Sequence, residues 1–277
     1  MTPVSEIEQV VMFIEKVKRQ SRHYASNLYL DIPKLELWIE LRLLDFIEIG
    51  KSIFLLKKNS GFYHLYFIAI DTESLDLDLE SLKISMGNET CVLDLIGTED
   101  GLGELIDLFK RKGFYVYSML ARMSKTTSDT VEAPSQSTDI HFANRDDMAV
   151  VSSYFDKYFD PFCEQIPLSE ELNNWMDKGE VIIYKRENEA VGGFLISERI
   201  GQTAYLRYWF VHPEFRERKV GSILIHEFFR NSKSSKRQIF WVIKSNDNAI
   251  KRYEHYGFRT ELLSDYIFIN RDLQYEK

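Results

Sequence analysis

The 277-residue chain has few of the residues that mark secreted, metal-binding or membrane proteins. Its two cysteines, Cys91 and Cys163, lie far apart and outside any CxxC pattern, so no disulfide framework is predicted. No two of its six histidines follow the His-x-x-x-His spacing, and we expect no metal. The chain lacks a run of about 18 apolar residues that would predict a membrane span, and residues 1–20 lack a secretory signal's basic start and apolar block. We therefore expect a reduced, cytoplasmic protein without a membrane partner.

Charge is distributed unevenly along the chain. The net charge is −8, yet residues 207–259 contain twelve Lys and Arg against five acidic residues. This segment therefore carries +7, and the rest of the chain carries −15. An acidic protein is a poor general nucleic-acid binder, so we expect no nucleic acid among its partners. A local basic zone suits a small polyanion, although a solvated basic surface accounts for the charge count equally well.

One polar, Ser/Thr-rich stretch divides the chain. We interpret residues 124–138 as a linker between an N-terminal domain at 1–123 and a C-terminal domain at 139–277. Hydrophobic periodicity in the C-terminal domain predicts the element order ααβββαβαβ. That order indicates an α+β or α/β layered fold.

The two domains share a short pattern of a helix, a Gly-Phe pair and a strand. Gly113-Phe114 corresponds to Gly257-Phe258, and Phe109 corresponds to Tyr253. These matches predict a distant tandem repeat. The same pattern is also common in unrelated folds, which leaves an independent origin open.

A segment in the middle of the C-terminal domain combines a strand end, a proline, a basic cluster and an apolar helix. A helix that starts near Val220 leaves its first backbone N–H groups without intrahelical acceptors, and the helix dipole adds positive charge there. Gly221 permits close approach of a phosphate to the backbone. Arg216, Arg218 and Lys219 can add charge-assisted hydrogen bonds. The pattern predicts a phosphate or pyrophosphate site; the alternative is a helix start whose glycine serves packing alone.

Two motifs in this domain follow one another in a fixed order. The first is Val211-His212-Pro213 followed by residues 216–222, and the second is residues 246–258, which read Asn-x-x-Ala-Ile-x-x-Tyr-x-x-x-Gly-Phe. Together they resemble the GNAT superfamily of N-acetyltransferases, over residues 140–270. The resemblance implies a GNAT-like mixed, mostly antiparallel sheet flanked by helices. One position departs from the family pattern, because Lys219 stands where the family has its first loop glycine.

The resemblance implies a site for acetyl-CoA or another acyl-CoA. The backbone of Phe210 and Val211 would bind the pantetheine arm, and Asn246 would hydrogen-bond to it. Lys219 would either crowd the loop or supply a further phosphate ligand. The residues expected to hold the pyrophosphate are Arg216, Glu217, Arg218, Lys219, Val220, Gly221 and Ser222.

The resemblance also implies direct transfer of an acyl group to a primary amine in a ternary complex. Tyr253 would sit near the thioester sulfur and act as the acid for the leaving thiolate; alternatively it is only an aromatic spacer in its helix. Glu198 is the candidate base, although a glutamate near a hairpin turn is more often a surface residue. His212 and His255 are predicted to be structural.

Two expectations concern the acceptor side of the site. The loop at residues 159–171 would border the acceptor, where Cys163 and Glu164 could touch substrate, although a packed cysteine is the simpler explanation. Strict strand alternation would divide six residues between two faces of the sheet. One face would carry Tyr205, Arg207 and Trp209, and the other Leu206, Tyr208 and Phe210.

The sequence leaves two functional hypotheses. One is an acyl-CoA-dependent N-acyltransferase acting on a small-molecule or peptide amine, and the other is a non-catalytic acyl-CoA-binding sensor or interaction protein. The N-terminal domain has no phosphate-loop motif, and Phe109 replaces the candidate acid. We therefore predict that this domain has lost cofactor binding and forms a wall of the acceptor cleft or a homodimer surface.

Overall fold

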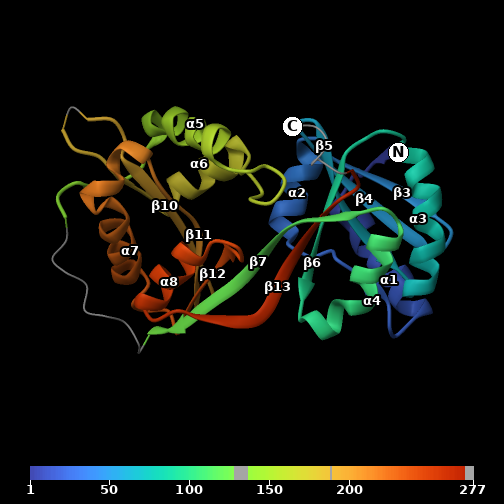
Figure 1. Cartoon of the computed structure of the whole chain (residues 1–277). Helices are drawn as coiled ribbons and strands as arrows, with labels where there is room; N and C mark the ends of the chain where they lie inside the picture. Colours follow the sequence, from blue (N-terminus) through green and yellow to red (C-terminus); the bar gives the residue numbers. More distant parts are fainter. Residues whose placement is uncertain (128–136, 188, 272–277) are drawn as a thin grey trace. The chain divides into compact units, whose positions relative to one another are not determined.

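The chain folds into two compact units, each with its own apolar core (Figure 1). The computed structural model describes residues 1–127, 137–187 and 189–271, so most of the predicted linker, residues 128–136, lies outside the described residues. Unit 1 comprises Met1–Met119 and the C-terminal segment that starts at Leu262. Unit 2 comprises Leu120–Glu261.

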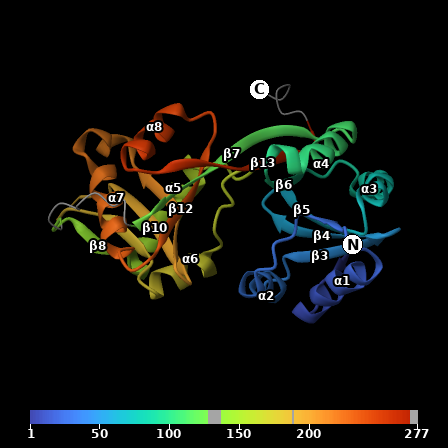
Figure 2. The ribbon, with the colours of Figure 1, turned by 90° about the horizontal axis from the view of Figure 1, so that it is seen from below.

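Unit 1 is a layered structure of helices and strands. In its sheet β3, β4 and β5 pair antiparallel, and β5 pairs with β6 in parallel. Figure 2 shows α1 and α2 on one side of these strands and α3 and α4 on the other. The elements are β1 (Thr2–Pro3), α1 (Ile7–Gln20), β2 (Ala25–Ser26), α2 (Ile32–Glu40), β3 (Leu44–Ile49), β4 (Ser52–Asn59), β5 (Phe62–Ala69), α3 (Thr72–Met86), β6 (Cys91–Gly97), α4 (Glu99–Arg111) and the first part of β7 (Tyr115–Thr126).

Unit 2 has the same kind of layering. Its sheet pairs β8, β9, β10 and β11 antiparallel, followed by β12 parallel to β11. Figure 1 shows α5 and α6 on one side of the strands and α7 and α8 on the other. The elements are β8 (Ile140–Phe142), η2 (Arg145–Asp147), α5 (Met148–Tyr158), α6 (Ser169–Asp177), β9 (Val181–Tyr184), β10 (Gly193–Ile200), β11 (Thr203–Val211), η3 (Pro213–Arg218), α7 (Val220–Asn231), β12 (Arg237–Ile243), α8 (Asp247–His255) and the start of β13 (Arg259–Ile269).

The central elements of the two units succeed one another in the same order. Two helices precede three antiparallel strands, and a helix, a parallel strand and a further helix follow, which gives α1 to α4 around β3 to β6 in unit 1 and α5 to α8 around β9 to β12 in unit 2. This shared order supports the tandem-repeat hypothesis. Mixed sheets with helices on both faces confirm the predicted fold class.

The structure divides the chain at other positions than the predicted 123 and 139. β7 continues past Met119, and its residues 120–126 pair antiparallel with β12 in unit 2. β13, which the sequence assigned to the C-terminal domain, pairs with β6 in unit 1 through residues 264–269. Its side chains from Tyr266 to Ile269 are buried there. Both strands therefore carry the chain from one unit into the other.

Several predicted absences can be compared with the described residues. No helix in the described ranges is long and apolar enough to cross a membrane. Within the same ranges no three His, Cys, Asp or Glu side chains form a group that could hold a metal ion. Cys91 and Cys163 are both buried free thiols, and burial raises the pKa of Cys91 to about 12.

Candidate active site

A β-bulge in β11 shapes the centre of unit 2. β10 and β11 pair with Ile196 opposite Tyr208 and Ser197 opposite Leu206, so Arg207 is the extra residue. A bulge reverses the side-chain alternation that follows it. Leu206 therefore shares the α7 and α8 face with Trp209, while Tyr208 lies on the α5 and α6 face. The predicted strict alternation is wrong for this reason.

The parallel pair β11 and β12 is joined along only a part of its length. Cα partners run from Thr203 and Arg237 to Tyr205 and Ile239, and the register ends there. Residues 206–211 of β11, which include the bulge, do not pair with β12. An unpaired strand edge presents backbone N–H and C=O groups that require other partners. The open edge of β11 includes Phe210 and Val211, the two residues predicted to bind the pantetheine arm through their backbone.

The 3₁₀ helix η3 connects this open edge to α7. His212 starts η3, and its Nδ1 accepts a hydrogen bond from the Glu214 N–H at 3.4 Å, which is the structural role expected of this histidine. Phe215 of η3 is buried against Gly192, where a Cβ atom would come within 2.5 Å of the phenylalanine ring. This close packing fixes η3, and with it the start of α7, against β10.

Lys219 adopts the left-handed conformation between η3 and α7. Its φ is +59° and its ψ is +19°, which is the region that glycine occupies at little cost. The lysine therefore preserves the backbone path expected of the family's glycine. Its side chain is exposed.

The amino end of α7 presents unpaired backbone donors. The first helical hydrogen bond runs from the Ile223 N–H to the Lys219 carbonyl at 3.1 Å, and no side chain caps the helix. The N–H groups of Val220, Gly221 and Ser222 therefore have no acceptor within the described part of the chain. Convergent N–H groups and the helix dipole favour an anion at this point.

The basic cluster beside this helix end is exposed, but one of its members is already engaged. Nη1 of Arg218 donates to both carboxylate oxygens of Glu189, each at 3.1 Å, and the guanidinium lies 4.7 Å from the Phe215 ring centre. Arg216 and Lys219 have no such ion pair among the described residues. They are therefore the cations better placed to meet an anion.

Trp209 connects the open strand edge to both motifs, a contact that strand alternation alone does not predict. A Cβ atom on Gly221 would lie 3.4 Å from the Trp209 ring and 3.4 Å from Val211. The indole ring also lies 5.5 Å from the Tyr253 ring, centre to centre. In the sequence, the only sign of this contact is that a large aromatic residue and the motif glycine both lie near the end of β11 and the start of α7.

α8 carries the second motif. Oδ1 of Asn246 accepts a hydrogen bond from the Ala249 N–H at 3.1 Å and so caps the helix, which leaves its amide N–H groups for another acceptor. Tyr253 packs between Trp209 and Phe240, whose ring centre lies 4.4 Å away. Burial raises the pKa of Tyr253 to about 12. Its hydroxyl has no hydrogen bond within the described residues and stays protonated at neutral pH.

Glu198 is not brought together with Tyr253 on one face of the sheet. It lies opposite Tyr205 across the strand pair, on the face away from the α7 and α8 core, and it forms an ion pair with Arg207. Tyr253 belongs to the core on the α7 and α8 face. The two candidate catalytic residues therefore approach the strand opening from opposite sides of the sheet.

Glu180 is a second carboxylate near this point that the sequence did not reveal. It follows Gly179 at the end of α6, and its Oε2 is buried without a hydrogen-bond partner among the described residues. Burial raises its pKa, and it interacts electrostatically with Glu198 and Arg207. A carboxylate with a raised pKa is typical of a general base.

The loop at residues 159–171 is held to β11. The Tyr208 hydroxyl donates to the Gln165 carbonyl at 2.6 Å, and Glu164 accepts the Asp160 N–H at 2.7 Å. Cys163 is buried. Burial raises the pKa of Glu164, and the suggestion that Cys163 or Glu164 touches substrate stays a prediction.

Comparison with known proteins identifies this arrangement. Residues 148–258 match the acetyltransferase (GNAT) family. Unit 2 is a GNAT domain. The human Cysteine-rich protein 2-binding protein (Homo sapiens) is 25% identical over 128 residues, which are 46% of this chain and 16% of that protein. The chain thus spans only a small part of that relative's length.

Solved structures extend the likeness in fold beyond the GNAT domain. A GCN5-related N-acetyltransferase from Sphaerobacter thermophilus has a TM-score of 0.58 at 11% identity, over 79% of this chain and 80% of that one. A tandem GNAT protein from the clavulanic acid biosynthesis pathway has a TM-score of 0.55 at 11% identity, over 80% of this chain and 78% of that one. A probable N-acyltransferase from Enterococcus faecalis has a TM-score of 0.59 at 9% identity, over 97% of this chain and 71% of that one. These similarities show a shared fold.

Proposed function

We propose that unit 2 binds acetyl-CoA or another acyl-CoA and transfers the acyl group to a primary amine. The observation that carries this proposal is the open backbone edge of β11, which leads through η3 to the uncapped amino end of α7. An extended thiol arm that ends in a pyrophosphate matches such a track, since it needs amide partners along the strand and an anion site at the helix. Membership of the GNAT superfamily supports the same ligand.

Each part of the cofactor has candidate partners in this chain. The N–H groups of residues 220–222 would hold the pyrophosphate, with Arg216 and Lys219 adding charge. The backbone of Phe210 and Val211 would bind the pantetheine arm. The amide N–H groups of Asn246 would reach the same arm from α8.

The reaction would begin with a neutral amine that attacks the thioester carbonyl. The C–N bond would form and the C–S bond break, the attacking nitrogen would lose a proton to the general base, and the departing thiolate would take up a proton from solvent, so that the net products are an amide and the CoA thiol. The Tyr253 hydroxyl would donate a hydrogen bond to the departing sulfur. Because its pKa of about 12 lies above that of a thiol, stabilisation by this hydrogen bond suits it better than full proton transfer.

Two carboxylates compete for the role of general base. Glu198 is engaged in an ion pair with Arg207. The Oε2 of Glu180 has no hydrogen-bond partner in the part of the chain that the structure describes, and burial raises the pKa of this carboxyl group. Glu180 therefore fits the removal of a proton from an ammonium substrate better than the candidate chosen from the sequence.

Titration calorimetry with acetyl-CoA tests the cofactor part of this proposal. Ser222→Glu places a carboxylate among the free N–H groups of α7, where it favours the helix through the dipole but repels a pyrophosphate. We expect the wild-type chain to bind and Ser222→Glu to bind at least tenfold more weakly. Asn231→Glu adds the same charge at the opposite end of α7 and should bind as the wild type does. No binding to the wild type at millimolar ligand would contradict the proposal.

A thiol-release assay with a panel of small-molecule and peptide amines then tests the transfer. If release of the CoA thiol requires both an amine and Glu180, the protein is an acyltransferase with Glu180 as its general base. Binding without release for any amine would favour the non-catalytic sensor.

A further inference from the structure

Unit 1 contains an opened pair of parallel strands of its own. β5 and β6 pair only at Tyr63 with Cys91 and at His64 with Val92. Beyond these positions the two strands continue without pairing to one another, as β11 and β12 do in unit 2. The helices α3 and α4 follow these strands, as α7 and α8 follow β11 and β12.

The chain itself fills the opening in unit 1. β2 pairs antiparallel with the free edge of β5, with Ala25 opposite Ala69 and Ser26 opposite Ile68. The Ser26 hydroxyl donates to the Phe67 carbonyl at 2.8 Å. Residues 25–28 thereby satisfy a strand edge that is left unpaired in unit 2.

The side chain of Asn27 joins both strands across the opening. Its Nδ2 donates to the Leu65 carbonyl at 3.0 Å on β5 and to the Asp94 carbonyl at 3.1 Å on β6. Its Oδ1 accepts the Phe67 N–H at 2.7 Å. One carboxamide thus makes three hydrogen bonds to the two backbones, which are the contacts that an amide of a pantetheine arm would otherwise seek.

The amino end of α3 is likewise occupied. Oδ1 of Asp71 accepts the Ser74 N–H at 2.7 Å, and this hydrogen bond lowers the pKa of the carboxyl group. Glu73 adds a second negative charge in the first turn. The corresponding helix α7 has no side-chain cap and follows Lys219. An anion at α3 would meet carboxylates where unit 2 offers free N–H groups and cations.

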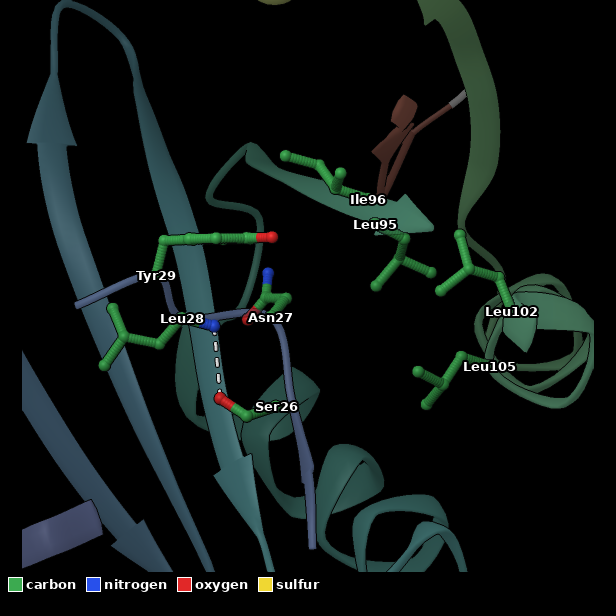
Figure 3. Close-up of a pocket in the computed structure, with 8 residues that line it drawn as sticks. All are labelled: Ser26, Asn27, Leu28, Tyr29, Leu95, Ile96, Leu102 and Leu105. Carbon is green, nitrogen blue, oxygen red and sulfur yellow. Dashed lines mark hydrogen bonds between the residues drawn. The ribbon is translucent and has the colours of Figure 1, made fainter. Parts of the chain in front are cut away.

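Apolar side chains occupy the remaining space near α4. In the register that aligns Phe109 with Tyr253, Leu102 stands at the position of Asn246 and Leu105 at that of Ala249. Both leucines line a cavity of about 60 Å³. Figure 3 shows its other walls, which are the segment from Ser26 to Tyr29 and the β6 residues Leu95 and Ile96. This cavity is far too small for a pantetheine arm.

We infer that residues 25–28 and Asp71 occupy in unit 1 the places that the pantetheine arm and the pyrophosphate take in unit 2, so that the chain binds one acyl-CoA. This inference rests on the proposed function for the second of these sites. In unit 1, residues 25–28 between α1 and α2 would then make the backbone contacts that the cofactor makes in unit 2.

The stoichiometry of acetyl-CoA binding, measured by native mass spectrometry, tests the inference. We expect at most one acetyl-CoA per wild-type chain, and a bound fraction on Ser222→Glu that falls by the same factor as its affinity in calorimetry, because unit 1 is closed. A second acetyl-CoA on the wild type, or a bound fraction that does not fall in Ser222→Glu, would overturn the inference while leaving an acyl-CoA-binding function intact.

Amide hydrogen exchange without ligand separates this inference from the proposed function. Phe67 and Ser74 donate to Asn27 and Asp71, so their amides should exchange slowly in the free protein and remain unchanged when acetyl-CoA is added. This result stands even if the wild type binds no cofactor. Rapid exchange at both amides in the free protein would show an unfilled opening and refute the inference.

Asn27→Ala provides the matched variant. It removes the acceptor of the Phe67 N–H, and we expect that amide to exchange at least tenfold faster. Asn88→Ala changes an exposed loop residue of the same type and should leave Phe67 unaffected. Equal exchange of Phe67 in Asn27→Ala and the wild type would count against the bridging role of Asn27.

Discussion

Lys219 is the residue at which the local sequence departs most clearly from the GNAT pattern. A lysine at this position could either distort the loop or supply an added phosphate ligand. The backbone at φ +59° decides against distortion, because the lysine has the conformation expected of a glycine. Only the conformational strain and the added charge remain as differences from the family pattern.

Lys219→Gly separates these two effects. Removing a side chain from the left-handed region should raise the free energy of unfolding by about 0.5–1 kcal/mol. Loss of the positive charge should weaken acetyl-CoA binding several-fold. Chemical denaturation and calorimetry measure the two quantities on one sample. Tighter binding by Lys219→Gly would show that the lysine hinders the cofactor.

Tyr253→Phe tests the hydroxyl that we propose as the hydrogen-bond donor to the leaving group. The ring contacts with Trp209 and Phe240 are retained, so the fold and the KM for acetyl-CoA should change little. Loss of the hydrogen bond to the departing sulfur should lower kcat by about 10²-fold. Tyr256→Phe removes a hydroxyl from the neighbouring aromatic residue and serves as the control. An unchanged kcat in Tyr253→Phe would leave the tyrosine as a packing residue.

At the scale of single elements, the sequence predicts what depends on local chemistry. The helix start after Lys219 follows from residues a few positions apart, and it is present. The bulge at Arg207 could not be predicted, because a bulge depends on the partner strand and no glycine or proline marks it. Glu180 could not be predicted as a site residue, because the burial that raises its pKa depends on the tertiary structure.

β13 carries a buried carboxyl group into the core of unit 1. Asp265 is 6% exposed, and its Oδ1 has no partner among the described residues. Burial and the neighbouring Asp94 raise the pKa of Asp265 well above its ordinary value. The folded chain therefore holds a proton that the unfolded chain releases near pH 4. Stability must fall as the pH rises from about 4 through the raised pKa.

Asp265→Asn should remove this pH dependence. We expect the free energy of unfolding at pH 8 to rise by about 1–2 kcal/mol relative to wild type, with a smaller change at pH 5. Denaturant titrations at both pH values provide the measurement. Asp156→Asn, on the exposed surface of α5, is the control. A larger gain at pH 5 than at pH 8 would contradict the assigned direction.

At the scale of the whole molecule, strand pairing connects the two halves of the chain. Residues 120–126 belong to the sheet of unit 2, and residues 264–269 belong to that of unit 1. The polar stretch after β7 suggested a boundary near residue 123, because composition reports local sequence only. Which strand joins which sheet depends on contacts more than a hundred residues apart, and no periodicity encodes them.

Fragments cut within residues 128–136 test this shared construction. The N-terminal fragment lacks the buried residues Tyr266 to Ile269, and the C-terminal fragment lacks the β7 residues that pair with β12. We expect each fragment to be unfolded or aggregated alone, and the two to co-purify as a folded complex when expressed together. Circular dichroism and size-exclusion chromatography distinguish these outcomes. A C-terminal fragment that is folded and monomeric alone would contradict the expectation.

Unit 2 is proposed to hold an acyl-CoA along β11 with its pyrophosphate at α7. A crystal structure of the protein with CoA tests this proposal. We expect pyrophosphate oxygens within hydrogen-bond distance of the N–H groups of residues 220–222, and the pantetheine arm on the backbone of Phe210 and Val211. CoA bound in the opening between β5 and β6, or with its pyrophosphate away from α7, would contradict it.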